Sequence, residues 1–313
     1  MNSGASSLRE LLRTSAARLH AAGSSSPRVD AEYLLLHVLG KTPVWLRMHD
    51  EVRLHLHDEE RFEALLKRRI HGEPVAYITG SRGFWSLDLV VNASTLIPRP
   101  ETEMLVEFAL EKLPLNAPLR VLDLGTGSGA IALAVKTERP VSMVTAVDAS
   151  TAALDVASAN AQRLNLDVEF LASNWFEALA GRRFDLVLAN PPYINPDDAH
   201  LGQGDVRFEP LSALVAAEQG LRDLRLIIST APACLQPGGW MALEHGYDQG
   251  AAVRALLQEN GFAEIETRQD LGGQERITLG VFIESRHSRA SGNLHTSAEH
   301  QKDSRLRGND GDS

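Results

Sequence analysis

The stretch Arg120-Val-Leu-Asp-Leu-Gly-Thr-Gly-Ser-Gly-Ala-Ile131 decides the fold of this chain. Its first five residues have the apolar pattern of a short strand, and glycines then stand at positions 125, 127 and 129. From Ala130 to Val135 the residues favour a helix. A glycine-rich turn between a strand and a helix lets the backbone approach a ligand closely. The stretch therefore predicts a strand, a ligand-binding turn and a helix.

The same alternation of strand and helix continues along the chain after this unit. Further strand patterns occupy residues 141–147, 168–171, 184–189 and 240–244, and helical patterns occupy 151–164 and 221–235. Alternation at this spacing predicts an α/β fold, with a parallel sheet covered by helices on both faces. Ligands of such sheets bind beyond the carboxyl ends of the strands. We therefore expect the segments near Gly125, Asp148 and Asn190 to meet in one cleft.

Asp148 follows Gly125 by 23 residues and ends the second strand. A carboxylate at this position can accept hydrogen bonds from both ribose hydroxyls, although it could also cap the helix that starts at Thr151. The glycine spacing GxGxG departs from the GxGxxG of dinucleotide-binding turns. The turn and the aspartate together predict a nucleoside site.

The most specific motif is Asn190-Pro-Pro-Tyr193, which ends the fourth strand. Two prolines fix the backbone and remove two N–H donors, so carbonyl groups stay free to accept hydrogen bonds. The Asn190 side chain adds another carbonyl acceptor, and Tyr193 adds an aromatic face. Such a group can hold a planar amino group by its two hydrogens, with the nitrogen lone pair directed outward. The alternative interpretation is a rigid Asn-Pro turn.

A nitrogen acceptor beside a nucleoside site points to S-adenosylmethionine as the cofactor. An amide nitrogen is a poor nucleophile because its lone pair is delocalised. Acceptors on its hydrogens favour the pyramidal form, which stabilises the transition state of methyl transfer, and positioning contributes further. The ring of Tyr193 could also face the cationic sulfonium.

At this point the sequence resembles the bacterial peptide chain release factor glutamine methyltransferases, over roughly residues 5–283. The resemblance is carried by several stretches: Gly72-Glu-Pro-Val-Ala-Tyr-Ile-Thr-Gly80, Leu96-Ile-Pro-Arg-Pro-Glu-Thr-Glu103, Asp123-Leu-Gly-Thr-Gly-Ser-Gly-Ala-Ile131, Asn190-Pro-Pro-Tyr-Ile194, Asp205-Val-Arg-Phe-Glu-Pro210 and Leu243-Glu-His-Gly246. Nucleic-acid amino-methyltransferases share the Asn-Pro-Pro-Tyr motif, whereas the second and fifth stretches are far more specific.

The resemblance implies a class I, Rossmann-like methyltransferase fold with a mostly parallel seven-stranded sheet and a small N-terminal helical domain. It implies that the substrate is the glutamine of the Gly-Gly-Gln loop of class 1 release factors. The catalytic residues would then be Asn190, Pro191, Pro192 and Tyr193, which would also bind the substrate. The cofactor would be bound by Asp123, Gly125, Thr126, Gly127, Ser128, Gly129, Asp148, Trp175 and Asn190.

Several further positions remain open between a functional and a structural role. Arg99 and Glu101 could contact the substrate or could be solvated charges, and Arg207 and Glu209 are weighed in the same way. The family usually has Asp where Asn174 stands. Asn174 could still accept a hydrogen bond from the cofactor through its carbonyl. Glu244-His245 is interpreted as a structural pair at a strand end, because no strong base is needed.

The chain organisation follows from the same patterns. We predict a helical substrate-recognition domain over residues 1–73, a linker with a β-hairpin over 74–98, the methyltransferase domain over 99–284 and a disordered tail over 285–313. In the first domain, Asp30 is expected to cap a helix that ends before Gly40, and a second helix is expected from Asp58 to Ile70. The tail is rich in Ser, Arg, Gly and Asn and has two leucines.

Composition limits the partners and the compartment. The formal net charge is −10, and the tail holds five basic and four acidic residues, so the folded part is acidic and has no general attraction for nucleic acid. No apolar run is long enough for a membrane helix. The single cysteine fits a reducing compartment, and the eleven histidines show no metal-site spacing. We expect a cytoplasmic monomer without a metal.

Three other functions compete with this interpretation. A nucleic-acid adenine amino-methyltransferase would use the same four-residue motif on a flipped base. A nicotinamide oxidoreductase is disfavoured by the glycine spacing, and a non-catalytic release-factor-binding protein is disfavoured by the intact motif. Residues Gly272-Gly-Gln274 also raise automethylation, but their position before a strand pattern predicts an ordinary hairpin turn.

Overall fold

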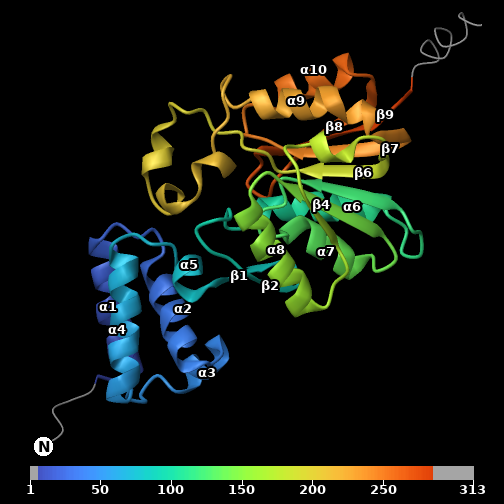
Figure 1. The fold of residues 1–313 in the computed structure, drawn as a ribbon. Coiled ribbons are helices and arrows are strands. Elements are labelled where there is room, and N and C mark those ends of the chain that lie inside the picture. The colour runs from blue at the N-terminus through green and yellow to red at the C-terminus, as the bar shows by residue number, and fades with distance from the viewer. Residues whose placement is uncertain (1–5, 285–313) are drawn as a thin grey trace, which may run out of the picture. The chain divides into compact units, whose positions relative to one another are not determined.

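The computed structural model describes residues 6–284, so the predicted disorder of residues 285–313 lies outside the described residues. The described part up to Ile283 forms one compact unit. Five helices come first: α1 (Leu8–Ala21), α2 (Pro27–Leu39), α3 (Pro43–Met48), α4 (Leu56–Ile70) and α5 (Val75–Thr79). Helices α1, α2 and α4 pack side by side around buried leucines and Phe62 (Figure 1).

The start of α2 corrects the sequence prediction. Asp30 does not cap this helix, which begins three residues earlier at Pro27 with Ser26 as its N-cap. A proline is well suited to the first helical turn, because its backbone is already fixed near the helical angle and its missing N–H is not needed there. Gly40 ends the helix in the left-handed conformation, as predicted.

A short hairpin follows the helices, as the sequence predicted. Strand β1 (Ser81–Phe84) pairs antiparallel with β2 (Leu87–Val90). The buried side chain of Asn160, from helix α8 (Thr151–Leu164), accepts from the Val90 amide at 2.8 Å and donates to the Val90 carbonyl at 2.9 Å. It also donates to the Ser128 carbonyl at 3.0 Å, so this one residue fastens the hairpin to the glycine-rich turn.

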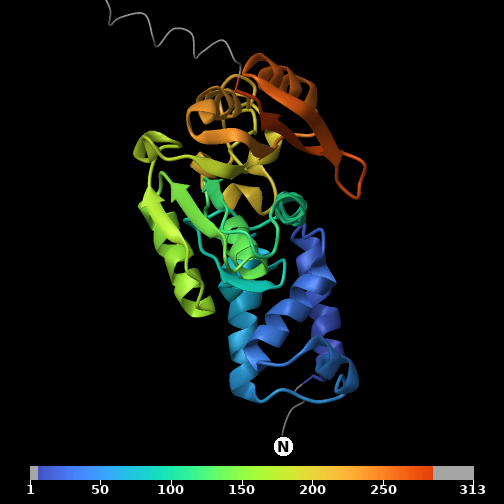
Figure 2. The ribbon, with the colours of Figure 1, turned by 90° about the vertical axis from the view of Figure 1, so that its right-hand side faces the viewer.

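The sheet has seven strands in the order β5-β4-β3-β6-β7-β9-β8. The strands are β3 (Arg120–Leu124), β4 (Met143–Asp148), β5 (Glu169–Ala172), β6 (Phe184–Ala189), β7 (Leu235–Glu244), β8 (Phe262–Gln269) and β9 (Glu275–Phe282). The first five strands in this order are parallel to their neighbours, and the last two run antiparallel. Figure 2 shows the β8–β9 hairpin in orange-red at one edge.

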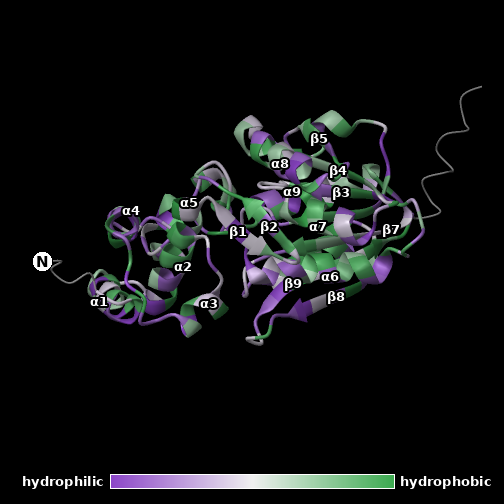
Figure 3. Cartoon of the chain, turned by 90° about the horizontal axis from the view of Figure 1, so that it is seen from below, coloured by the Kyte–Doolittle hydropathy of each residue, from purple (hydrophilic) through white to green (hydrophobic). Residues whose placement is uncertain are grey.

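Helices cover both faces of the sheet, because alternate residues of each central strand point to opposite faces. Val121 of β3 belongs to one apolar cluster, with α6 (Glu103–Lys112) and α7 (Ala130–Glu138). Leu122 and Leu124 belong to the other, with α9 (Arg222–Thr230) and α10 (Gly250–Glu259). In Figure 3 the strands and helices of this region carry green, hydrophobic residues interspersed with purple, hydrophilic ones.

Strand β7 begins at Leu235, five residues earlier than predicted, and α9 ends at Thr230 rather than at residue 235. Pro232 cannot donate a backbone hydrogen bond, so the helix gives way to one 3-10 turn before the strand. The remaining one-turn 3-10 helices are Pro100–Thr102, Glu177–Leu179, Ala199–Gly202, Val206–Phe208 and Leu211–Ala213. The Gly272-Gly-Gln274 segment is the turn between β8 and β9, as predicted.

Candidate active site

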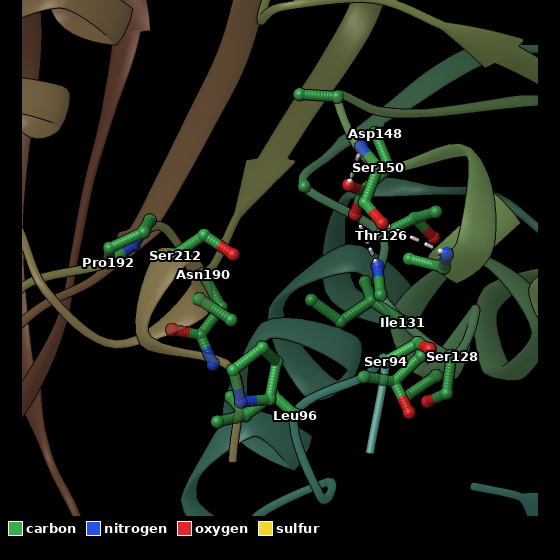
Figure 4. A pocket seen from close by; sticks show the side chains of 18 of the residues that line it. Ser94, Leu96, Thr126, Ser128, Ile131, Asp148, Ser150, Asn190, Pro192 and Ser212 are labelled. Carbon is green, nitrogen blue, oxygen red and sulfur yellow. Dashed lines mark hydrogen bonds between the residues drawn. The ribbon is translucent and has the colours of Figure 1, made fainter. Parts of the chain in front are cut away.

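A cavity of about 340 Å³ lies beyond the carboxyl ends of β3, β4 and β6. Figure 4 shows Asn190 and Pro192 on one side of this cavity and Asp148 and Ser150 on the other. Nine of the predicted site residues line it: Arg99, Gly125, Thr126, Gly127, Ser128, Asp148, Trp175, Asn190 and Pro192. Five others do not: Glu101, Asp123, Gly129, Pro191 and Tyr193.

The glycine-rich turn forms the floor of the cavity. Gly125 and Thr126 both donate to the Val147 carbonyl at 2.9 Å, which ties the turn to the end of β4. Gly125 has a φ of +71°, and a side chain there would lie 3.3 Å from the ring of Trp175. Only glycine adopts this backbone conformation easily and leaves space for the ring.

Asp123 lies beneath the turn rather than in the cavity. Its Oδ2 accepts from the Thr126 hydroxyl at 2.6 Å and from the Ala132 amide at 3.2 Å. Its Oδ1 is buried and accepts no hydrogen bond within the described part of the chain. Burial raises the pKa of Asp123 to about 7, and the nearby charge of Asp148 contributes in the same direction. Asp123 therefore supports the turn from below.

Asp148 uses both carboxylate oxygens to organise the cavity wall. Oδ2 accepts from the Gly127 amide at 2.9 Å, and Oδ1 accepts from the Ser150 amide at 2.8 Å. The Ser150 hydroxyl then accepts from the Ala153 amide and caps helix α8. The sequence offered ribose binding and helix capping as alternatives, and the structure gives the capping of α8 to Ser150.

Trp175 and Asn174 form the wall next to Asp148. Trp175 has a left-handed backbone, with a φ of +50°, which turns its ring over Gly125. Asn174 is exposed, and its side-chain amide donates to Glu177 Oε1 at 2.7 Å. Because the amide group is used in this way, the carbonyl oxygen of Asn174 stays free to accept from a ligand.

Asn190 is held at the cavity by a hydrogen-bonded relay. Its Nδ2 donates to the Thr102 hydroxyl at 3.1 Å, and that hydroxyl donates to Glu244 Oε2 at 2.7 Å. The Tyr193 hydroxyl donates to Glu244 Oε1 at 3.2 Å. Within residues 6–284, neither Asn190 Oδ1 nor the Pro191 carbonyl accepts a hydrogen bond. Two acceptors are thus available at the end of β6.

The backbone after these prolines is fixed by two close neighbours. The side-chain amide of Gln249 donates to the Tyr193 carbonyl at 3.0 Å. Gly220 packs so closely that a side chain there would come within 2.0 Å of the same carbonyl oxygen. Gly220 therefore has to be glycine, and its absent side chain sets the position of the Tyr193 backbone.

Arg99 reaches the cavity as one half of an ion pair. Its guanidinium contacts Glu209 Oε1 at 2.5 Å, and the Glu209 side chain is fully buried. The other oxygen of Glu209 accepts from the Ile97 amide at 3.2 Å. Glu101 lies elsewhere, close enough to Glu244 and Arg276 to influence their charge. The structure thus brings Arg99 to the cavity and leaves Glu101 outside it.

Several site residues escaped the sequence analysis. Thr102 belongs to the stretch Leu96–Glu103, but the sequence assigned it no role. Glu244 was interpreted as structural. Gly220 and Gln249 have no sequence signal at all, since each contacts Tyr193 across a long chain separation. The cavity lining also includes Ser94, Thr95, Leu96, Pro98, Ser150, Asn174, Pro210, Ser212, Ala213, Arg222 and Asp223.

The described residues form neither a metal-ligand cluster nor a helix that could cross a membrane. Residues 6–284 hold no group of three or more His, Cys, Asp or Glu side chains that could bind a metal ion. No helix among them has both the length and the apolar character needed to cross a membrane.

Two family models match separate parts of the chain. Residues 10–80 match the family described as the PrmC N-terminal domain, and residues 101–204 match the methyltransferase small domain. A solved methyltransferase of Pyrococcus furiosus superposes with a TM-score of 0.50 at 17% identity, over 70% of this chain and 98% of its own. This similarity confirms the predicted methyltransferase fold.

Curated relatives extend over most of the chain. A release factor glutamine methyltransferase of Pseudomonas aeruginosa is 56% identical over 258 residues, which cover 82% of this chain and 93% of that protein. A protein of the same name from Xylella fastidiosa is 54% identical over 265 residues, covering 84% and 96%. The chain therefore belongs to the release factor glutamine methyltransferase family.

Proposed function

We propose that this enzyme transfers a methyl group from S-adenosylmethionine to the side-chain amide nitrogen of the glutamine in the Gly-Gly-Gln loop of class 1 release factors. The observation that carries the proposal is the pair of free acceptors on Asn190, which lines a cavity with a glycine-rich floor, and on Pro191, the next residue along the chain. The names of the curated relatives support the same substrate.

The residues around the cavity fit the cofactor. Gly125 to Ser128 present backbone where the methionine part would lie, and Asp148 offers a carboxylate for the ribose hydroxyls. The carbonyl of Asn174 and the ring of Trp175 suit the amino group and the face of an adenine. When bound, S-adenosylmethionine supplies an electrophilic methyl group on a sulfonium.

The chain itself would bind and orient the substrate amide. Asn190 Oδ1 and the Pro191 carbonyl would each accept one hydrogen of the glutamine NH₂ group. This contact favours the pyramidal nitrogen, whose lone pair is then available for methyl transfer. Pro192 lines the cavity, and Tyr193 anchors the motif through its hydroxyl and backbone. No strong base is required, because the alkylated nitrogen loses a proton easily.

Further expectations concern the oligomeric state, the binding partners and the cellular location of the enzyme. We propose that the enzyme acts as a monomer on the release factor protein, without binding nucleic acid, and that it works in the cytoplasm. The acidic net charge of −10 supports the expectation about nucleic acid. The nucleic-acid adenine methyltransferase is not favoured, because the curated relatives carry the release factor name over most of the chain.

Transfer of label from S-adenosylmethionine tests the proposal. The substrates are an unmethylated class 1 release factor, the same protein with alanine in place of the loop glutamine, and adenine-containing RNA and DNA. We expect label on the first protein only. Label on the nucleic acid, or equal label on both proteins, would contradict the proposed substrate.

A further inference from the structure

Glu244 lies at the end of β7 and contacts two residues of the candidate site that are far from it in sequence. Thr102 donates to its Oε2 at 2.7 Å across a separation of 142 residues, and Tyr193 donates to its Oε1 at 3.2 Å. Glu244 is buried, with 1% of the residue exposed. We propose that Glu244 is a positioning residue that fixes the amide orientation of Asn190. This inference rests on the function proposed above.

The argument begins with the directions of the hydrogen bonds. An ionised carboxylate can only accept, whereas a threonine hydroxyl has one hydrogen to donate. The hydrogen of Thr102 is used by Glu244, so its oxygen can only accept from Asn190. Asn190 must therefore turn its NH₂ group to Thr102. Its carbonyl oxygen is then left for the substrate amide.

The opposite orientation of Asn190 would be unproductive. Its carbonyl would face Thr102, whose hydrogen would have to leave Glu244 and turn toward Asn190. A carboxylate oxygen of a residue that is only 1% exposed would then lose a donor, which is costly. The NH₂ group of Asn190 would meanwhile face the NH₂ group of the substrate glutamine, and two donors cannot bind each other. Glu244 thus selects the reactive arrangement from a distance.

The charge state of Glu244 decides whether this selection operates. Burial raises its pKa to about 7, and the negative charge of Glu101 acts in the same direction. The hydrogen bonds from Thr102 and Tyr193 and the positive charge of Arg276 act in the opposite direction. Below its pKa the carboxyl group gains a proton and can donate to Thr102. The hydroxyl of Thr102 is then free to turn toward Asn190.

The test uses two variants that reverse or remove the relay. In Glu244→Gln the new NH₂ group can donate to Thr102, and Thr102→Val has no hydroxyl. We expect kcat to fall by about 10² in each, as is typical when one preorganised electrostatic contact is lost. The Kd for S-adenosylmethionine should change less than about twofold. Thr102→Ser keeps the hydroxyl and should recover most of the kcat that Thr102→Val loses.

The matched control is Thr278→Val, which removes the hydroxyl of another buried threonine, in strand β9. Thr278 contacts His245 at 2.7 Å and Thr267 at 2.8 Å, outside the cavity. We expect this variant to lose stability and to keep its kcat. A purely structural role for Glu244 would make Thr278→Val and Thr102→Val lose kcat to the same extent.

A pH profile separates positioning from packing. The kcat of the unmodified enzyme, at saturating substrates, should fall as the pH drops through about 7, and Glu244→Gln should lose this dependence. Unchanged kcat in Thr102→Val, with normal methylation by the unmodified enzyme, overturns the inference even when Glu244→Gln fails to fold. Failure of the unmodified enzyme to methylate the release factor overturns the proposed function instead.

Discussion

At the scale of single residues, Asp148 makes two structural hydrogen bonds and also lines the cavity, where it can bind a ligand. Each of its oxygens accepts one backbone amide, from Gly127 and from Ser150. A carboxylate oxygen can accept more than one hydrogen bond, so both oxygens can also receive a ribose hydroxyl. An asparagine in place of Asp148 would have one acceptor oxygen only, and its NH₂ group would face a backbone N–H donor.

The variant Asp148→Asn should therefore bind S-adenosylmethionine more weakly. The lost contacts involve a charged acceptor, for which about 1.5–3 kcal/mol is typical. This corresponds to a rise in Kd of roughly ten- to a hundredfold, which isothermal titration calorimetry can measure. The control is Asp155→Asn, an equal charge change on the exposed face of α8. Equal Kd values for the two variants would exclude Asp148 from the binding site.

Asn174 offers a second test at this scale, because its amide group is already bound to Glu177. The variant Asn174→Asp places two carboxylates at this contact, where both side chains are exposed. We expect no gain in cofactor affinity from the single variant. The double variant Asn174→Asp with Glu177→Gln should bind several times more tightly than the single one in the same titration. If the two bind equally, Glu177 does not control this position.

At the scale of elements, the segment from Asp205 to Glu209 connects the N-terminal helices to the cavity. Arg69 of α4 is buried and contacts Asp30 of α2 at 2.7 Å and Asp205 at 2.6 Å. Arg207 donates to the His71 carbonyl at 3.2 Å, and Glu209 pairs with Arg99. The next residues include Pro210, Ser212 and Ala213 of the cavity wall. Side-chain contacts of this segment therefore connect α4 to the cavity wall.

Two variants test separately how much these contacts contribute to the stability of the protein and how they affect the site. Arg69→Met leaves the buried Asp30 without its cation and should cost about 3–5 kcal/mol of unfolding free energy. Asp205→Ala removes only a half-exposed partner, so the loss should stay within about 1 kcal/mol. We expect Asp205→Ala to raise the KM for the release factor about fivefold through a looser cavity wall. Urea unfolding and methylation kinetics measure the two effects; an unchanged KM would contradict the connection.

The sequence predicted the elements better than it predicted the contacts between them. The patterns around Gly125, Asp148 and Asn190 placed three strand ends in one cleft, because the alternation of strand and helix implies parallel strands whose carboxyl ends lie at the same edge. The relay from Asn190 through Thr102 to Glu244 joins residues far apart in the chain, and no local pattern encodes it. The predicted start of α2 was wrong. Pro27 is well suited to the first helical position, so the helix begins before Asp30. The boundaries at residues 73 and 98 stay a prediction.

At the scale of the whole molecule, the buried carboxyl groups connect stability to pH. The pKa of Glu244 is about 7 in the folded protein, above the ordinary value of 4.5. The folded state therefore keeps this proton between pH 4.5 and 7 while the unfolded state releases it. By linkage, the contribution of Glu244 to the unfolding free energy decreases as the pH rises through this range, and it is constant above about 7.

The variant Glu244→Gln removes this titration. Relative to the unmodified protein, its unfolding free energy should rise steadily from about pH 4.5 to about pH 7 and then stay level. Urea unfolding at a series of pH values measures the difference, and Glu259→Gln, at an exposed position of α10, is the control that should show little slope. A difference that does not vary with pH would mean that Glu244 titrates at its ordinary pKa.

The central claim is that the transferred methyl group arrives on the glutamine side chain of a release factor. Tandem mass spectrometry of the release factor peptide, after reaction with the unmodified enzyme and with Asn190→Ala, tests it most directly. We predict one added methyl group on the amide nitrogen of the loop glutamine with the unmodified enzyme, and a loss of at least about 10² in rate with the variant. A methyl group on any other residue, or full activity of Asn190→Ala, would contradict the account.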